Sequence, residues 1–151
     1  MPAAIVDRQR RVAIPARHLA RAAQRALDAL GRPASDVDIA IVDDPEIRAL
    51  NAAHRGIRRR TDVLAFPLEL AGEASGLLGQ VVISAETAAR QARKIGVPLP
   101  LELELLTTHG VLHLAGYDDR DPVEADLMHR RERELLGAGA PARLWKGLLP
   151  G

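Results

Sequence analysis

His109 and His113 are the side chains best suited to chemistry, because they stand four positions apart in a segment that is otherwise helix-forming. At 3.6 residues per turn, side chains with this spacing project from one face of a helix. Such a face can offer two imidazoles to a single metal ion. The pair therefore predicts a metal site, with ordinary polar residues on a half-exposed helix as the alternative interpretation.

A glycine and a carboxylate follow this pair. Gly116 is expected to end the helix and let the chain turn back, which makes Asp119 the natural third ligand, with Asp118 and Asp121 as the next candidates. Two histidines and one carboxylate leave a coordination position open for a reacting water. The chain has no cysteine, so a metal must rest on His, Asp or Glu.

Other chemistries are less well supported by the residues. Gly110 follows His109 where a helical zinc peptidase carries glutamate as its general base, so peptidase chemistry lacks its proton acceptor. A metal-dependent oxygenase also uses two histidines and a carboxylate, but two ligands on one helix are not typical of that class. His18 and His129 lie among charged residues and are interpreted as structural.

The motif extends beyond the ligands. Residues 109–118 read His-Gly-Val-Leu-His-Leu-Ala-Gly-Tyr-Asp, which closely resembles the signature of the YbeY family of bacterial metal-dependent endoribonucleases. Residues 50–56 (Leu-Asn-Ala-Ala-His-Arg-Gly) and 61–67 (Thr-Asp-Val-Leu-Ala-Phe-Pro) resemble the family's second block, in the expected order. The similarity covers nearly the whole chain.

This resemblance implies a function. The implied function is that of a single-strand-specific endoribonuclease in ribosomal RNA maturation, which would hydrolyse RNA phosphodiesters with metal-activated water. The implied cofactor is one divalent ion, with zinc expected, and the implied partners are ribosomal RNA and the small ribosomal subunit or its proteins. A second hypothesis is a ribosome-associated RNA-binding assembly factor whose metal is structural or weakly active.

Two positions depart from the family's pattern. The third ligand is ordinarily histidine where this chain has Asp119, and a carboxylate lowers the positive charge of the site, which weakens Lewis acidity and favours harder ions. This difference supports the assembly-factor hypothesis. Gln80 follows Gly79 where the family usually carries an acidic residue, and an amide cannot act as a base.

The densest basic cluster begins at Arg55 and continues with Arg58, Arg59 and Arg60. The resemblance assigns Arg55 a catalytic role, in which its guanidinium stabilises charge in the transition state. The whole cluster is a candidate RNA-binding surface for phosphates, with a solvated loop as the alternative. The chain holds only one Phe, one Tyr and one Trp, too few for a base-stacking platform.

Composition sets the outer limits. The 151 residues, 47% hydrophobic and 27% charged, predict one folded domain spanning residues 1–151. No apolar run of about 18 residues is present, which predicts no membrane span. Asp7 and Arg8 come too early for a signal peptide, so a cytoplasmic location is expected.

The hydrophobic pattern predicts the elements that must position the site. We expect an α+β domain, in which helices cover a small mixed sheet and the metal site lies at the end of a central helix. Asp44 and Ser84 are expected N-caps, and Val123, Leu127 and Leu135 the apolar stripe of the last helix. Strands are expected at 3–6, 37–42, 61–66 and 80–83, with a further candidate at 11–14, and helices at 15–30, 44–54, 85–95, 101–114 and 122–136.

Overall fold

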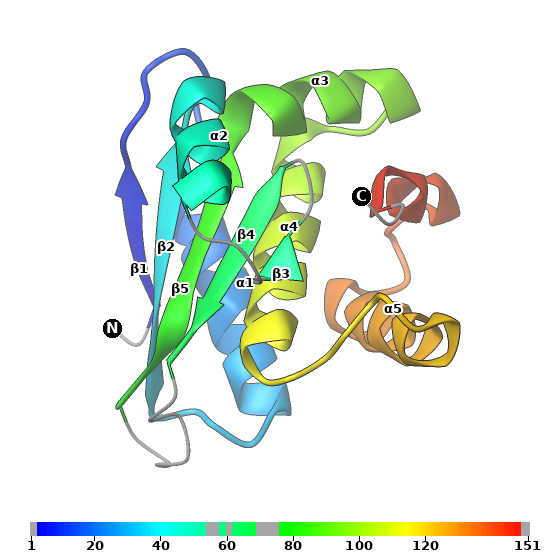
Figure 1. Ribbon diagram of the computed structural model, residues 1–151. Helices are drawn as coiled ribbons and strands as arrows, with labels where there is room; N and C mark the ends of the chain where they lie inside the picture. Colours follow the sequence, from blue (N-terminus) through cyan, green and yellow to red (C-terminus); the bar gives the residue numbers. More distant parts are fainter. Residues whose placement is uncertain (1–2, 54–57, 60–61, 69–75, 149–151) are drawn as a thin grey trace.

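The computed structural model describes residues 3–53, 58–59, 62–68 and 76–148. Within these residues five strands form one sheet in the order β1-β2-β5-β4-β3 (Figure 1). β1, β2 and β5 are parallel, whereas β4 and β3 join antiparallel, so the sheet is mixed. The strands are β1 (Ala3–Asp7), β2 (Ser35–Val42), β3 (Arg58–Arg59), β4 (Val63–Pro67) and β5 (Gly76–Ser84).

The helices cover the sheet unequally. α1, α3 and α4 pack on one face, α2 lies on the other, and α5 and η1 stand beside α4 on its side away from β1 and β2 (Figure 1). This arrangement confirms the predicted α+β class. The helices are α1 (Ala16–Ala29), α2 (Asp44–Ala53), α3 (Ala85–Ile95), α4 (Leu99–Leu114), α5 (Pro122–Leu136) and the 3-10 helix η1 (Ala142–Leu148).

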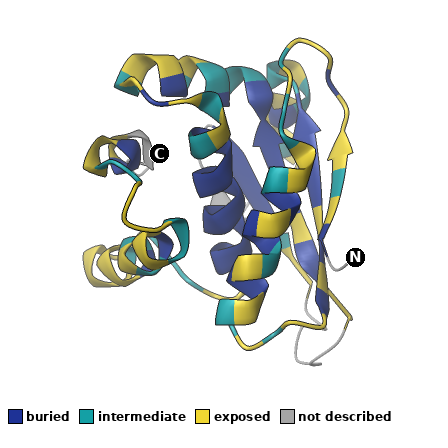
Figure 2. Cartoon of the chain, turned by 180° about the vertical axis from the view of Figure 1, so that it is seen from behind, coloured by how far each residue is buried: buried dark blue, intermediate teal, exposed yellow. Residues whose placement is uncertain are grey.

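α4 is the central helix. From Glu102 to Leu114 all of its residues are buried, and it contacts α1, α3, α5, β4 and β5 (Figure 2). Gly110 permits the close approach to β5, because a Cβ atom there would lie 2.5 Å from Val81 Cγ1. The helix that carries the two histidines is therefore held rigidly against the sheet.

Several predicted elements need correction. Residues 11–14 are not a strand, because the side chain of Gln9 accepts from the amides of Arg11 and Val12 and donates to the Val12 carbonyl. β5 begins at Gly76 rather than at residue 80, and η1 corresponds to no predicted element. Parallel pairing with β2 explains the longer strand, since it continues as far as Ser35 and Gly76.

Two side-chain assignments also differ. Val123 is 68% exposed and Leu127 50% exposed, so the predicted stripe on α5 is wrong at these two positions, whereas Leu135 is partly buried and packs against the core. The buried residues of α5 are Met128 and Glu132. The first turn of α2 is capped by Asp43 rather than by the predicted Asp44, because the Asp43 carboxylate accepts from the Glu46 amide. None of the helices in the described parts of the chain is long and apolar enough to cross a membrane.

Candidate metal centre

The two histidines lie in the last turns of α4, and Asp119 lies in the turn that follows. The amide of Tyr117 donates to the Leu112 carbonyl, and Gly116 takes a φ of 103°, a left-handed conformation that favours glycine. This reversal ends the helix and brings Asp119 back over the histidines. Ser84 shows equally local control at α3, where its hydroxyl accepts from the Thr87 amide as predicted.

The three predicted ligands meet at their polar atoms. Nε2 of His109 lies 3.0 Å from Nε2 of His113, and the carboxylate of Asp119 lies 3.4 Å from the first and 3.7 Å from the second. Their ligand atoms all lie within 4.8 Å of one another. His109 is fully buried, and Asp119 is half-buried.

The Nδ1 atoms of both rings act as hydrogen-bond donors. Nδ1 of His113 lies 2.8 Å from the Tyr117 carbonyl oxygen, which can only accept, so Nδ1 carries the proton. Nδ1 of His109 lies 2.6 Å from the carboxylate of Glu132 and donates in the same way. In neutral rings both Nε2 atoms therefore present lone pairs to each other and to Asp119.

Three acceptors that converge in this way require a positive charge between them. A divalent cation meets that requirement, and imidazole with carboxylate is a common donor set for one. We conclude that the residues present fit a metal ion.

The pKa values of His109 and Asp119 are also shifted in the directions that favour a positive charge at this site. Burial by itself lowers the pKa of His109, but the Glu132 charge and the hydrogen bond with Asp119 outweigh it and raise that pKa well above its usual value. Burial raises the pKa of Asp119, yet hydrogen bonds from His109 and His113 hold it far below its ordinary range. Both shifts arise because the two imidazoles lie in contact with the carboxylates of Asp119 and Glu132.

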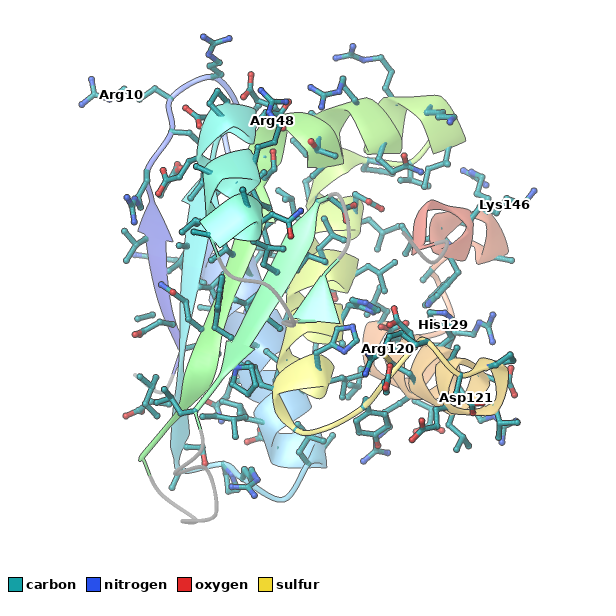
Figure 3. The ribbon with its side chains drawn as sticks, viewed as in Figure 1. Arg10, Arg48, Arg120, Asp121, His129 and Lys146 are labelled. Atoms are coloured by element: carbon teal, nitrogen blue, oxygen red, sulfur yellow. The ribbon has the colours of Figure 1, made fainter. Side chains whose placement is uncertain are left out.

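The alternative carboxylates are engaged elsewhere. Asp118 pairs with Arg120, and Nη2 of Arg120 lies 3.0 Å from Oδ2 of Asp118. Asp121 caps α5 by accepting from the Glu124 amide at 3.1 Å. Arg120 and Asp121 belong to the turn between α4 and α5, and His129 projects from α5 itself (Figure 3).

Sequence reasoning missed Glu132. The Glu132 carboxylate is fully buried and touches both His109 and His129, which places His129 beside the site, and its predicted structural role stays a prediction. The one available signal was spacing, since Glu132 follows the buried Met128 by one helical turn. His18 pairs with Glu104 on α1 and α4, in agreement with a structural role.

The arginine predictions stay predictions. Arg55 and Arg60 lie outside the described residues, and the structure describes only the backbone of Arg58 and Arg59, in β3. Gln80 is exposed on β5 and shares a sheet face with Val82, on the side opposite α4. That position separates Gln80 from the histidines.

Comparisons with known proteins place this fold and site in a class and then in a family. An α+β fold of this kind occurs in the solution structure of TM1509 from Thermotoga maritima, with a TM-score of 0.60 and 23% identity over 97% of this chain and 91% of that one. The family model described as Endoribonuclease YbeY matches residues 4–139. The chain therefore belongs to the YbeY endoribonuclease family.

Curated relatives agree with this assignment. The chain is 44% identical over 138 residues to the Endoribonuclease YbeY of Anaeromyxobacter sp. (strain Fw109-5), covering 85% of this chain and 72% of that protein. It is 45% identical over 123 residues to the Endoribonuclease YbeY of Anaeromyxobacter dehalogenans (strain 2CP-C), covering 82% of this chain. The match spans 64% of that second relative, just under two thirds of its length.

Proposed function

We propose that this protein is a metal-dependent endoribonuclease that hydrolyses single-stranded RNA and acts in ribosomal RNA maturation. The observation that carries the proposal is the convergence of one possible ligand atom each from His109, His113 and Asp119, all within 4.8 Å of one another. Membership of the YbeY family supports the choice of RNA as substrate. Ribosomal RNA and the small ribosomal subunit or its proteins are the proposed partners.

The proposed cofactor is one divalent ion, with zinc as the expected metal, held by His109, His113 and Asp119. When bound, such an ion supplies Lewis acidity toward a phosphoryl oxygen and activates a water molecule. The chain's own part is orientation: Tyr117 and Glu132 fix the two rings so that both Nε2 atoms face the same point. Asp119 contributes a negative charge that reduces the electrophilic character of the centre.

The arginine cluster at Arg55, Arg58, Arg59 and Arg60 is the proposed means of holding RNA phosphates. Binding by phosphate contacts weakens as salt rises, by about 0.7 in log affinity per unit log salt for each contact with a single strand. Replacing Arg58, Arg59 and Arg60 by alanine should therefore lower RNA affinity and flatten its salt dependence. Arg55→Ala should lower turnover more than affinity, because a group aimed at the scissile phosphate acts most in the transition state.

The deciding experiment combines metal analysis with RNA cleavage. Purified protein is loaded in turn with Zn²⁺, Mn²⁺ and Mg²⁺ and given one RNA sequence as a single strand and as a duplex. We expect one ion per chain and cleavage of the single strand, both lost in His113→Ala. His18→Ala is the matched control, because His18 pairs with Glu104 and should leave cleavage unchanged.

The second function, an RNA-binding assembly factor, is favoured by the carboxylate at Asp119. In that case the protein binds one ion and RNA but cleaves neither substrate with any of the three metals. Such a result would overturn the proposed catalysis and leave the metal site in place.

A further inference from the structure

Glu132 is the buried carboxylate at the back of the candidate metal centre. It lies on α5 and is fully buried. Oε2 lies 2.6 Å from Nδ1 of His109, while Oε1 lies 2.7 Å from Nδ1 of His129 and 3.1 Å from Nε1 of Trp145. Its three nitrogen partners thus come from α4, α5 and η1.

These contacts suit an ionised carboxylate. Its two oxygens face three nitrogen atoms, and the indole Nε1 of Trp145 among them can only donate. An ionised carboxylate can only accept, so each of the three nitrogens donates a proton to it. The His109 ring is therefore held with its proton on Nδ1 and its Nε2 toward His113.

The same residue joins the outer layer of the fold to the site. The buried side chains of α5 are those of Met128 and Glu132, and η1 reaches the carboxylate through the indole of Trp145. The guanidinium of Arg133 lies over that indole, 5.2 Å from the ring centroid. Glu132 thus contacts both the ligand candidate His109 and the indole of Trp145.

We propose that Glu132 is a positioning residue of the metal centre, which orients His109 for the ion and transmits metal occupancy to Trp145. This inference rests on the proposed metal binding by His109, His113 and Asp119. Hydrogen bonds from ligand histidines to carboxylates fix ring orientation and raise ligand basicity, and losing them costs about 10- to 100-fold in metal affinity.

The first test is Glu132→Gln. The amide keeps the size of the side chain but replaces one acceptor oxygen by a donor, which must face either His109 or the pair formed by His129 and Trp145. We expect Zn²⁺ affinity, measured by competition with a chromophoric chelator, to fall about 10- to 100-fold. Glu134→Gln is the matched control, because Glu134 is an exposed glutamate of the same helix that pairs with Arg131.

A purely structural role for Glu132 predicts a different outcome. It would lower the free energy of unfolding of the metal-free protein and leave Zn²⁺ affinity within about threefold of the parent, a change too small for a lost ligand-orienting contact. That result overturns the proposal. Loss of affinity in Glu132→Gln with the parent value in Glu134→Gln supports it.

The second test needs no substitution at Glu132, and it still applies if Glu132→Gln does not fold. Trp145 is the only tryptophan in the sequence, so its fluorescence reports its surroundings alone. We expect Zn²⁺ to change the emission of the parent protein, with saturation at one equivalent, and to leave the emission of His113→Ala unchanged. Emission that stays constant while Zn²⁺ binds overturns the coupling to Trp145.

Failure of the underlying metal site has its own signature. If the parent protein binds no Zn²⁺ in the chelator competition, both the metal site and the positioning role are overturned. If the parent binds Zn²⁺ and Glu132→Gln binds it equally well, the site stands and only the role of Glu132 is lost.

Discussion

Two polar clusters sit at helix ends in this fold, and they differ in one respect. At the junction of α2 and α3, the carboxylate of Asp44 accepts from the hydroxyls of Ser84 and Thr87 and pairs with Arg90 at 2.8 Å. At the end of α4, the Nε2 atoms of His109 and His113 and the carboxylate of Asp119 face one another, and with neutral rings protonated on Nδ1 all of them are acceptors. The first cluster is complete within the chain, whereas the second brings together residues that could hold a cation.

The comparison shows what marks a ligand site. Burial raises the pKa of Asp44, but hydrogen bonds from Ser84 and Thr87 and the charge of Arg90 lower it to about 2, so a perturbed carboxylate occurs in both clusters. The match of donors to acceptors separates them. A cluster in which every acceptor has a donor stabilises the fold, whereas a cluster of facing acceptors is a candidate site for a cation.

The largest expected effect is the loss of metal binding in His113→Ala. Removing one of two imidazoles leaves a histidine and a carboxylate, too few ligands to hold an ion firmly in a site of this type. Isothermal titration with Zn²⁺ should show no binding by His113→Ala and parent-like binding by Asp44→Ala. Binding lost equally in both variants would contradict the division between the clusters.

Next in size is the effect of the third ligand. Asp119→His places the family's usual ligand in the same turn, and we expect it to bind Zn²⁺ at least about tenfold more tightly than Asp119→Ala, the scale of other changes around metal ligands. The chelator competition measures both. Equal affinities would show that Asp119 does not reach the ion.

Asp44→Ala should reduce stability rather than metal affinity. The substitution removes a shared acceptor from Ser84, Thr87 and Arg90, and we expect the free energy of unfolding to fall by about 1–3 kcal/mol. Urea unfolding of the metal-free protein gives this value. Asp126→Ala is the control, because Asp126 pairs with Arg130 on the surface and should change stability by less than about 0.5 kcal/mol.

The smallest effect is the pH dependence of that same contribution. The pKa of Asp44 in the folded protein, about 2, lies below its ordinary value of 3.8, so the ionised carboxylate favours folding. Its contribution is fully present above pH 3.8 and is lost as pH falls through 2. The stability difference between the parent and Asp44→Asn should therefore be constant near neutral pH and shrink on acidification. A difference that grows instead would reverse the assigned sign.

The sequence predicted the local features of the fold and of the site. The N-cap at Ser84 and the helix ranges 85–95 and 122–136 are confirmed, because caps act within a few residues of the groups they satisfy. The convergence of His109 and His113 follows from helical periodicity alone. Their roles as ligands remain for the metal measurements above.

The features that were not predicted depend on distant contacts. Glu132 joins the site only because α5 folds against α4; its spacing from Met128 puts both on one face of α5 but does not show what that face contacts. The outward position of Val123 and Leu127 has the same origin, since the packing of α5 selects Met128 and Glu132 instead. Asp43 and Asp44 are chemically identical neighbours, but Asp44 accepts from the hydroxyls of Ser84 and Thr87, far away in the sequence, while Asp43 caps α2.

The contact between Gly110 and Val81 also limits what this helix can become. A glutamate after the first histidine would convert the motif into that of a zinc peptidase, a change of one residue in the sequence. Here that side chain would begin 2.5 Å from Val81 and be driven into the sheet, away from the face that carries His109 and His113. The packing of α4 against β5 therefore does not accommodate the glutamate of a zinc peptidase at position 110, and that substitution would require α4 to move away from β5.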